Sequence, residues 1–224
     1  MYAYYVKGPA LWRPYYYEEA VYGLPLLRVE LPRRWNSRRV GAVLRRAGVR
    51  YTLNLPEGGM VTPEPLLVST RSLWQSAAAE LALAELTRRG VPWGKATVGV
   101  LASRTTREVW EALERLSGQV RALALNLPER ERVALLLQRE NGVPVLAGAG
   151  DVTLCFAPAE PGEGRLLLGA ERPAPEGFTL TVPGVPVPEG CPAEGLYGAL
   201  YQSGRLPGRA EISAQGKGRP SKPE

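Results

Sequence analysis

The chain has 224 residues, 45% of them apolar, and a formal net charge of +6 at neutral pH, so it can bury one sizeable core or one core with a smaller lobe. It contains no histidine, which excludes histidine-ligated metals and the serine and cysteine mechanisms that use a histidine base. No uncharged apolar stretch approaches the roughly 18 to 20 residues that span a bilayer, and the start lacks a signal-peptide pattern, so we expect a cytoplasmic protein that does not use a membrane.

Residues 1–65 predict a small N-terminal α/β lobe. Seven of the ten tyrosines fall within the first 25 residues, and aromatic residues favour strands. Apolar and charged residues then alternate with the period of a half-buried strand. The predicted elements are two short strands or a hairpin in the first 25 residues, a strand over 24–32, a helix over 38–48 capped by Asn36 or Ser37, a strand over 49–55 and a turn at Gly58 and Gly59.

Residues 66–182 predict a larger α/β domain, because strands alternate with helices and several strands are continuously apolar. Such strands are typical of a parallel sheet that is buried on both faces. Strong helix formers predict one long helix from about Ser72 to Arg89, which Gly90 and Pro92 end. The other predicted elements are strands over 66–69, 97–102, 120–125, 143–146, 151–156, 165–170 and 178–182 and helices over 105–117 and 128–142.

Residues 183–224 are rich in proline and glycine and predict a flexible C-terminal tail. One short amphipathic helix interrupts this tail at about 193–203, and we expect it to dock on the core or on a partner subunit. From residue 213 onward the chain has nothing to bury, so we expect disorder there.

The junction between the predicted strand at 97–102 and the following helix is the best candidate for a binding site. It reads "VGVLASRTTREVW" over residues 98–110. A helix N-terminus attracts anions through unpaired N–H groups and the helix dipole, and Ser103, Arg104, Thr105 and Thr106 could complete a phosphate pocket there. The alternative is capping alone, with Thr105 or Thr106 as the N-cap residue and Glu108 close behind it.

This region also resembles a known family. The stretch "VGVLASRTTREVWEALERLSGQVRALAL" looks like the second strand and helix of the NADP-binding domain of the shikimate dehydrogenase family, and "GDVTLCFAP" is similar to a later strand of that domain. The resemblance covers about 90 residues. It implies a Rossmann-like fold, with Ser103, Arg104 and Thr105 at the 2′-phosphate of NADP and Asp151 on the nicotinamide side.

The chain departs from that family where a dinucleotide would approach the backbone. The turns after both candidate first strands, 66–69 and 97–102, lack the glycines that permit close approach of the pyrophosphate. The family's catalytic lysine and aspartate have no match in the first 65 residues. We therefore expect a Rossmann-like domain without dinucleotide chemistry, and NADP stays only as an alternative cofactor.

Few residues elsewhere could carry chemistry. Asp151 is the only aspartate, and it either orients a ligand from the "AGAGD" loop or is an ordinary turn residue. Cys155 and Cys191 lie far apart without CxxC spacing, so free buried thiols are expected rather than a disulfide or a zinc site. These observations weigh against an enzyme, and we expect neither catalytic residues nor a metal.

An arginine-rich segment provides an alternative site. Phosphate-neutralising arginines with a stacking aromatic residue are typical of nucleic-acid binding, although a solvated helix face explains the same pattern. The residues concerned are Arg33, Arg34, Trp35, Arg38 and Arg39.

Three functional hypotheses follow from the sequence. The leading one is a non-catalytic or weakly ligand-binding protein that acts through a protein partner or a second copy of itself, or senses a nucleotide or phosphorylated small molecule. The first alternative is an NADP-dependent oxidoreductase of the shikimate dehydrogenase type. The second is a nucleic-acid-binding protein that uses the arginines of residues 33–50.

Overall fold

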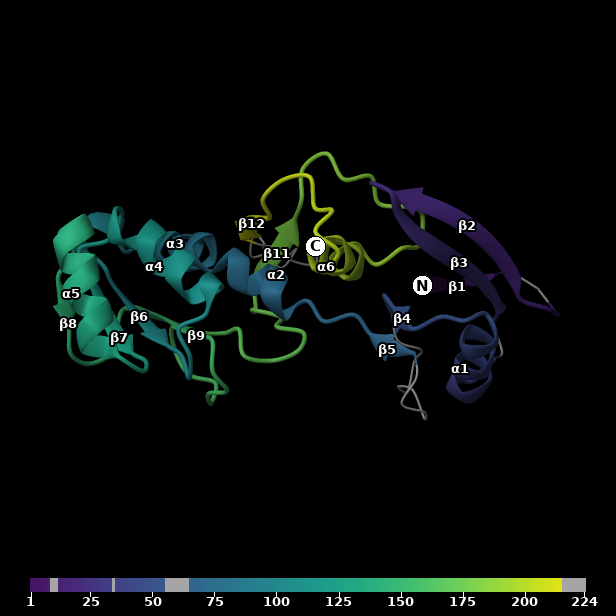
Figure 1. Ribbon diagram of the computed structural model, residues 1–224, viewed down its shortest axis with the longest axis horizontal. Helices are drawn as coiled ribbons and strands as arrows, with labels where there is room; N and C mark the ends of the chain where they lie inside the picture. Colours follow the sequence, from purple (N-terminus) through teal and green to yellow (C-terminus); the bar gives the residue numbers. More distant parts are fainter. Residues whose placement is uncertain (9–11, 34, 55–64, 215–224) are drawn as a thin grey trace, which may run out of the picture. The chain divides into compact units, whose positions relative to one another are not determined.

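The computed structural model describes residues 1–8, 12–33, 35–54 and 65–214. These residues form two compact units, each made of two chain segments (Figure 1). The first unit contains Met1–Thr70 and Val182–Arg209, and the second contains Arg71–Thr181 and the described chain from Ala210. Within the described residues no helix combines the length and the apolar character that crossing a bilayer requires.

The first unit is built on a mixed sheet with strand order β2-β3-β1-β4-β5. β2 and β3 form an antiparallel hairpin whose turn residues Tyr22 and Gly23 both have positive φ, 49° and 71°, as the tightest hairpin turns require. The other neighbours in the sheet are parallel. The strands are β1 (Tyr2–Gly8), β2 (Tyr15–Val21), β3 (Leu24–Pro32), β4 (Tyr51–Thr52) and β5 (Leu66–Leu67).

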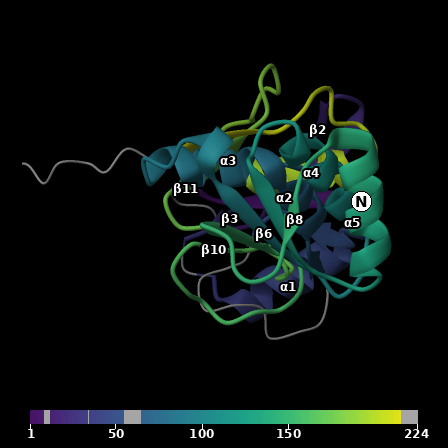
Figure 2. The same cartoon turned by 90° about the vertical axis from the view of Figure 1, so that its left-hand side faces the viewer.

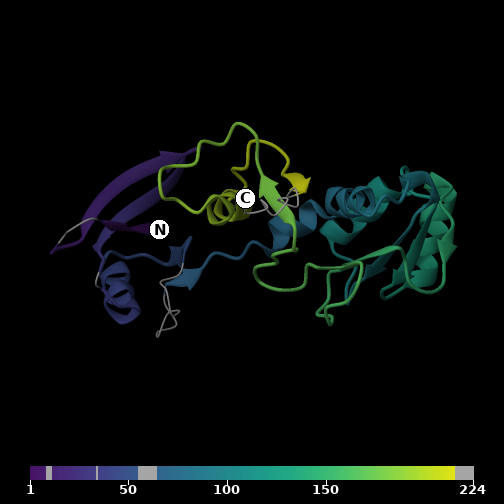
Figure 3. The ribbon, with the colours of Figure 1, turned by 180° about the vertical axis from the view of Figure 1, so that it is seen from behind.

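Two helices complete the first unit (Figure 3). Helix α1 (Ser37–Arg46) begins after Asn36, whose side chain accepts a hydrogen bond from the N–H of Arg39, so one of the two predicted caps is confirmed. Its apolar stripe packs on the buried face of β3. Helix α6 (Ala193–Gln202), the helix expected at 193–203, belongs to this unit, where a Cβ on Gly195 would lie 2.6 Å from the Leu53 carbonyl oxygen.

The second unit contains a parallel sheet, called sheet B, with strand order β10-β9-β6-β7-β8 (Figure 2). Numbered along the chain, its strands stand in the order fifth, fourth, first, second, third, which is the Rossmann order. The expected fold class, a Rossmann-like parallel sheet flanked by helices in a chain that also has a smaller α/β lobe, is confirmed. The strands are β6 (Thr97–Leu101), β7 (Ala122–Asn126), β8 (Val145–Leu146), β9 (Val152–Cys155) and β10 (Arg165–Leu167).

The helices of the second unit follow the predicted alternation with one difference. The helix expected from Ser72 to Arg89 is interrupted at Ala77, where φ and ψ are −100° and 15°. Helices α3 and α4 pack together, as do α4 and α5. The helical elements are α2 (Arg71–Ser76), α3 (Ala78–Arg88), the 3₁₀ turn η1 (Trp93–Lys95), α4 (Arg107–Ser117) and α5 (Arg130–Asn141).

The second unit also contains a small antiparallel sheet. It pairs β11 (Phe178–Thr181) with β12 (Glu211–Ala214). The disorder expected from residue 213 onward is wrong for Ser213 and Ala214, which belong to β12. This strand was not predicted, because its alternating sequence is only four residues long and lies in a segment dominated by proline and glycine. The rest of the expected flexible tail, residues 215–224, and the turn at Gly58 and Gly59 lie outside the described residues.

Candidate functional site

The candidate site begins where β6 ends. Ser103–Thr106 form the turn between β6 and α4, and all four residues are exposed. Thr106 is the N-cap residue, and its Oγ1 accepts a hydrogen bond from the N–H of Val109 at 3.4 Å. The capping role predicted for this turn is therefore confirmed for Thr106. The first amides of α4 have no carbonyl partners within the helix and carry the positive end of its dipole.

The topology fixes the place of this turn in the fold. β6 is the central strand of sheet B and the first along the chain, so Ser103–Thr105 follow the first strand of the Rossmann wind. The resemblance to the shikimate dehydrogenase family assigned these residues to the end of the second strand. In this sheet the second strand is β7, which ends at Asn126. The strand at Leu66–Leu67, the other candidate first strand, pairs with β4 in the first unit.

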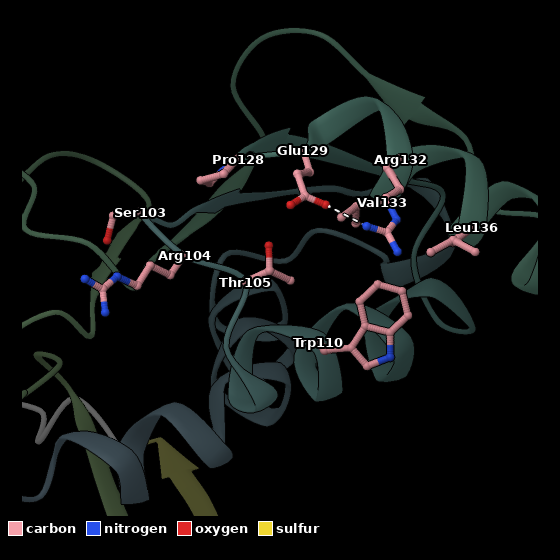
Figure 4. Close-up of a pocket in the computed structure, with 9 residues that line it drawn as sticks. All are labelled: Ser103, Arg104, Thr105, Trp110, Pro128, Glu129, Arg132, Val133 and Leu136. Carbon is pink, nitrogen blue, oxygen red and sulfur yellow. Dashed lines mark hydrogen bonds and ion pairs between the residues drawn. The ribbon is translucent and has the colours of Figure 1, made fainter.

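A hollow of about 480 Å³ opens beside the turn (Figure 4). It lies at the carboxyl edge of sheet B, where ligands bind in open parallel sheets. Its lining comes from the turns after β6 and β7 and from helices α4 and α5. The lining residues are Ser103, Arg104, Thr105, Trp110, Pro128, Glu129, Arg132, Val133 and Leu136.

The two cations of the hollow, Arg104 and Arg132, differ in the partners that they have. Within the described part of the chain, the Arg104 guanidinium has neither an ion pair nor a hydrogen bond. Arg132 lies 3.1 Å from a carboxylate oxygen of Glu129, and the two side chains are 77% and 65% exposed. An ion pair with this exposure contributes little to stability. One positive charge is therefore available to a ligand and a second is weakly held.

Trp110, Glu129 and Arg132 were not predicted as site residues. The indole of Trp110 is half-buried and lies along one side of the hollow (Figure 4), and its Nε1 donates to Glu114 at 2.5 Å. Glu129 has φ +56° at the start of α5. A signal existed in the sequence: "NLPERER" follows the second strand, and the turns after adjacent parallel strands meet at one edge of the sheet.

Asp151 is not part of this hollow. It precedes β9, so it lies at the amino edge of sheet B, whereas Ser103–Thr106 follow β6 at the carboxyl edge. Its Oδ2 accepts a hydrogen bond from the Thr97 N–H at 2.7 Å, and its own N–H donates to the Thr97 carbonyl at 2.8 Å. Asp151 therefore fixes the start of β9 against the start of β6.

The "AGAGD" loop has a structural explanation. It links β8 at one edge of the sheet to β9 on the far side of β6, and it passes the start of β6 without a helix. A Cβ on Gly150 would lie 2.4 Å from the amide nitrogen of Gly99 and 2.7 Å from the carbonyl oxygen of Thr97. Only glycine fits at this approach between two backbones.

The arginine segment of the first unit presents charge without an exposed aromatic face. Arg33, Arg38 and Arg39 are exposed, and Arg34 lies outside the described residues. Trp35 is partly buried and packs against the core cluster under α1. The indole therefore takes part in the packing of the lobe, which reduces the surface available for stacking on a base.

Both cysteines are buried free thiols, as expected. Burial, and then repulsion by Glu19, raise the pKa of Cys191 to about 12. Burial also raises the pKa of Cys155, against the opposing effect of Arg165. Neither cysteine lines the hollow, and both thiols stay protonated near neutral pH, so neither is an activated nucleophile.

Comparisons of the chain with protein-family models and with curated proteins find no match. No relative therefore supplies a ligand, a reaction or a partner. The chemistry of the hollow rests on its own residues and on its place at the carboxyl edge of the sheet.

Proposed function

We propose that the chain is a cytoplasmic, non-catalytic binding protein whose second unit senses a small phosphorylated ligand in the hollow beside Ser103–Thr105. The observation that carries this proposal is the Arg104 guanidinium. Among the described residues it has no partner, and it lies on the rim of a hollow at the start of α4. A guanidinium beside a helix N-terminus suits a phosphate group.

The glycine-free turn favours a ligand smaller than a dinucleotide. Every residue from Ser103 to Thr106 carries a Cβ, so a pyrophosphate cannot approach the backbone as closely as it does at a glycine-rich turn. Trp110, Val133 and Leu136 supply an apolar wall for the rest of the ligand. A phosphate monoester with a planar or apolar body fits this combination better than NADP does.

The lining favours binding over catalysis. Glu129 is the only carboxylate among the lining residues, and Arg132 pairs with it. An exposed carboxylate that is held in an ion pair is poorly placed to act as a general base. We therefore propose that ligand occupancy is transmitted to a protein partner or a second copy of the chain.

Isothermal titration and thermal-shift measurements with adenosine monophosphate, inorganic phosphate and NADP⁺ test the proposal. We expect the monophosphate to raise the melting temperature and Arg104→Gln to weaken its binding by about tenfold, the value of one charge-assisted hydrogen bond. Arg139→Gln is the matched control, because Arg139 is an exposed arginine in the last turn of α5, away from the hollow. The proposal is wrong if none of the phosphates binds at millimolar concentration, or if both variants bind equally.

A further inference from the structure

A second cavity, of about 590 Å³, lies beside β10, which is an edge strand of sheet B. Its walls are the last turn of α3, the loop before β10, β10 itself and residues 170–176. It shares no lining residue with the hollow at Arg104. Its volume falls in the range of small-molecule sites and exceeds what a single phosphate ion fills.

Four arginines and three glutamates line this cavity, and they differ in the hydrogen bonds and ion pairs that they form. Arg88 is fully engaged, because its Nε and Nη2 donate to the two carboxylate oxygens of the buried Glu85 at 2.6 and 2.8 Å. Its guanidinium carbon also lies 5.8 Å from the centre of the Phe178 ring. Arg88 therefore belongs to the packing of α3 and is not free to bind a ligand.

Arg89 is held at one end and weakly paired at the other. Its Nη1 donates to the backbone carbonyl of Asp151, which fixes the guanidinium in place. Its Nη2 donates to Glu163 at 2.6 Å, but the Glu163 side chain is 89% exposed. An ion pair with so exposed a carboxylate is worth little. An incoming anion can therefore replace Glu163 on a donor that is already oriented.

Two further arginines have no acidic partner within the described part of the chain. Arg165, the first residue of β10, donates from Nη1 to the backbone carbonyl of Glu160 at 3.2 Å and forms no ion pair. Arg172 is half-buried, and its guanidinium makes no hydrogen bond or ion pair with described residues. The third lining acid, Glu176, is exposed. The cavity thus holds an excess of positive charge on side chains that are not neutralised.

We propose that this cavity binds a small polyvalent anion, a polycarboxylate or a polyphosphate, through Arg89, Arg165 and Arg172, and that Glu163 occupies the anion position on Arg89 until the ligand displaces it. Planar guanidinium groups match carboxylate and phosphate oxygens in pairs. Several such groups around one cavity suit a ligand with more than one anionic group. This site is separate from the one in the proposed function, and either can exist without the other.

Titration calorimetry at low ionic strength with citrate and with tripolyphosphate tests the site and distinguishes the two ligand classes. We expect at least one of them to bind the wild-type chain, and Arg172→Gln to weaken that binding by about tenfold or more. Arg104→Gln should leave it unchanged, because Arg104 lies at the other hollow. If Arg172→Gln fails to fold, Arg165→Gln replaces it.

The decisive variant is Glu163→Gln, which we expect to bind the same anion about two- to fivefold more tightly, because it removes the competing carboxylate. Misfolding cannot produce this gain. Glu160→Gln is the matched control for a general change in charge, since the exposed Glu160 side chain does not line the cavity. Its affinity for the anion should rise less than that of Glu163→Gln. The proposal is overturned if neither anion binds, if Glu163→Gln gains no more than Glu160→Gln, or if Arg104→Gln abolishes the binding.

Discussion

The amino and carboxyl edges of sheet B carry similar small and polar residues, and the chain uses them differently. At the amino edge Asp151 bonds both backbone groups of Thr97, and Gly150 lies against the backbone of β6. At the carboxyl edge Ser103–Thr105 are exposed, and Arg104 has no partner among described residues. Next to β6, the amino edge is committed to the fold, whereas the carboxyl edge keeps groups that a ligand can use. Substitutions at Gly150 and Asp151 should therefore change stability, and a substitution at Arg104 should change binding.

Gly150→Ala should have the largest effect. The added methyl group would meet two backbone atoms of β6, at 2.4 and 2.7 Å, and backbone atoms cannot move aside as a flexible side chain can. We expect the free energy of unfolding, measured by urea denaturation, to fall by about 3 kcal/mol. Gly118→Ala is the control, because nothing lies within 4 Å of its Cβ position, and it should change stability by less than about 0.5 kcal/mol. Equal midpoints for the two variants would remove the close approach as the reason for this glycine.

Asp151→Ala should have the second largest effect and lower the free energy of unfolding by about 2 kcal/mol in the same denaturation measurement. It leaves the buried Thr97 N–H without its charged acceptor, and hydrogen bonds to charged groups are worth this much. Asp151→Asn keeps an acceptor oxygen and should lose less. If Asp151→Ala instead abolished phosphate binding without loss of stability, the assignment of this residue to the fold would be contradicted.

Arg104→Gln should reverse this pattern. We expect about tenfold weaker binding of a phosphate monoester with a change in unfolding free energy below about 0.5 kcal/mol, because the side chain is exposed. Measuring Asp151→Asn in the same titrations completes the comparison, since its affinity should equal that of the wild type. A stability loss above 1 kcal/mol for Arg104→Gln would mean that the turn supports the fold more than the site.

Thr106→Ala should have the smallest effect and lower the free energy of unfolding by about 0.5 to 1 kcal/mol, because it removes the N-cap of α4. Its neighbour Thr105 lines the hollow, so Thr105→Ala should change the free energy of unfolding by less. Thermal and urea denaturation of the two variants provide the check. If Thr105→Ala were the more destabilising change, the capping role would have been assigned to the wrong threonine.

The local elements could be predicted from the sequence, and their pairing could not. Continuous apolar runs identify β6 and β7, and Asn36 is recognisable as a cap from its residue type. The pairing of the two-residue strand β5 with β4 depends on tertiary contacts that a pattern over 66–69 does not contain. The same holds for β12, which is stabilised as a strand by pairing with β11.

Only part of the candidate site could be predicted, because the rest of it depends on strand pairing. Ser103, Arg104 and Thr105 were identified because a strand end and a helix start are local signals. Glu129 and Arg132 reach the same hollow only because β7 is the neighbour of β6, and strand order is not a local property. The family resemblance groups Asp151 with the ligand turn, but a residue that directly precedes a strand of a parallel sheet lies at the edge opposite to the turns that follow the strands.

The division of the first unit into two chain segments has a consequence for synthesis. The mixed sheet of the first unit forms from Met1–Thr70, but α6, which packs against Leu53 and Ser69, comes from Val182–Arg209. At typical ribosomal rates the intervening stretch, residues 71–181, takes roughly 6 to 22 s to appear. Sheet B, whose last strand ends at Leu167, can therefore pair its strands on the ribosome before the N-terminal lobe receives its final helix. The lobe whose sheet is made first therefore waits for a segment that is made after sheet B, and until then the residues that α6 covers, Leu53 among them, stay uncovered.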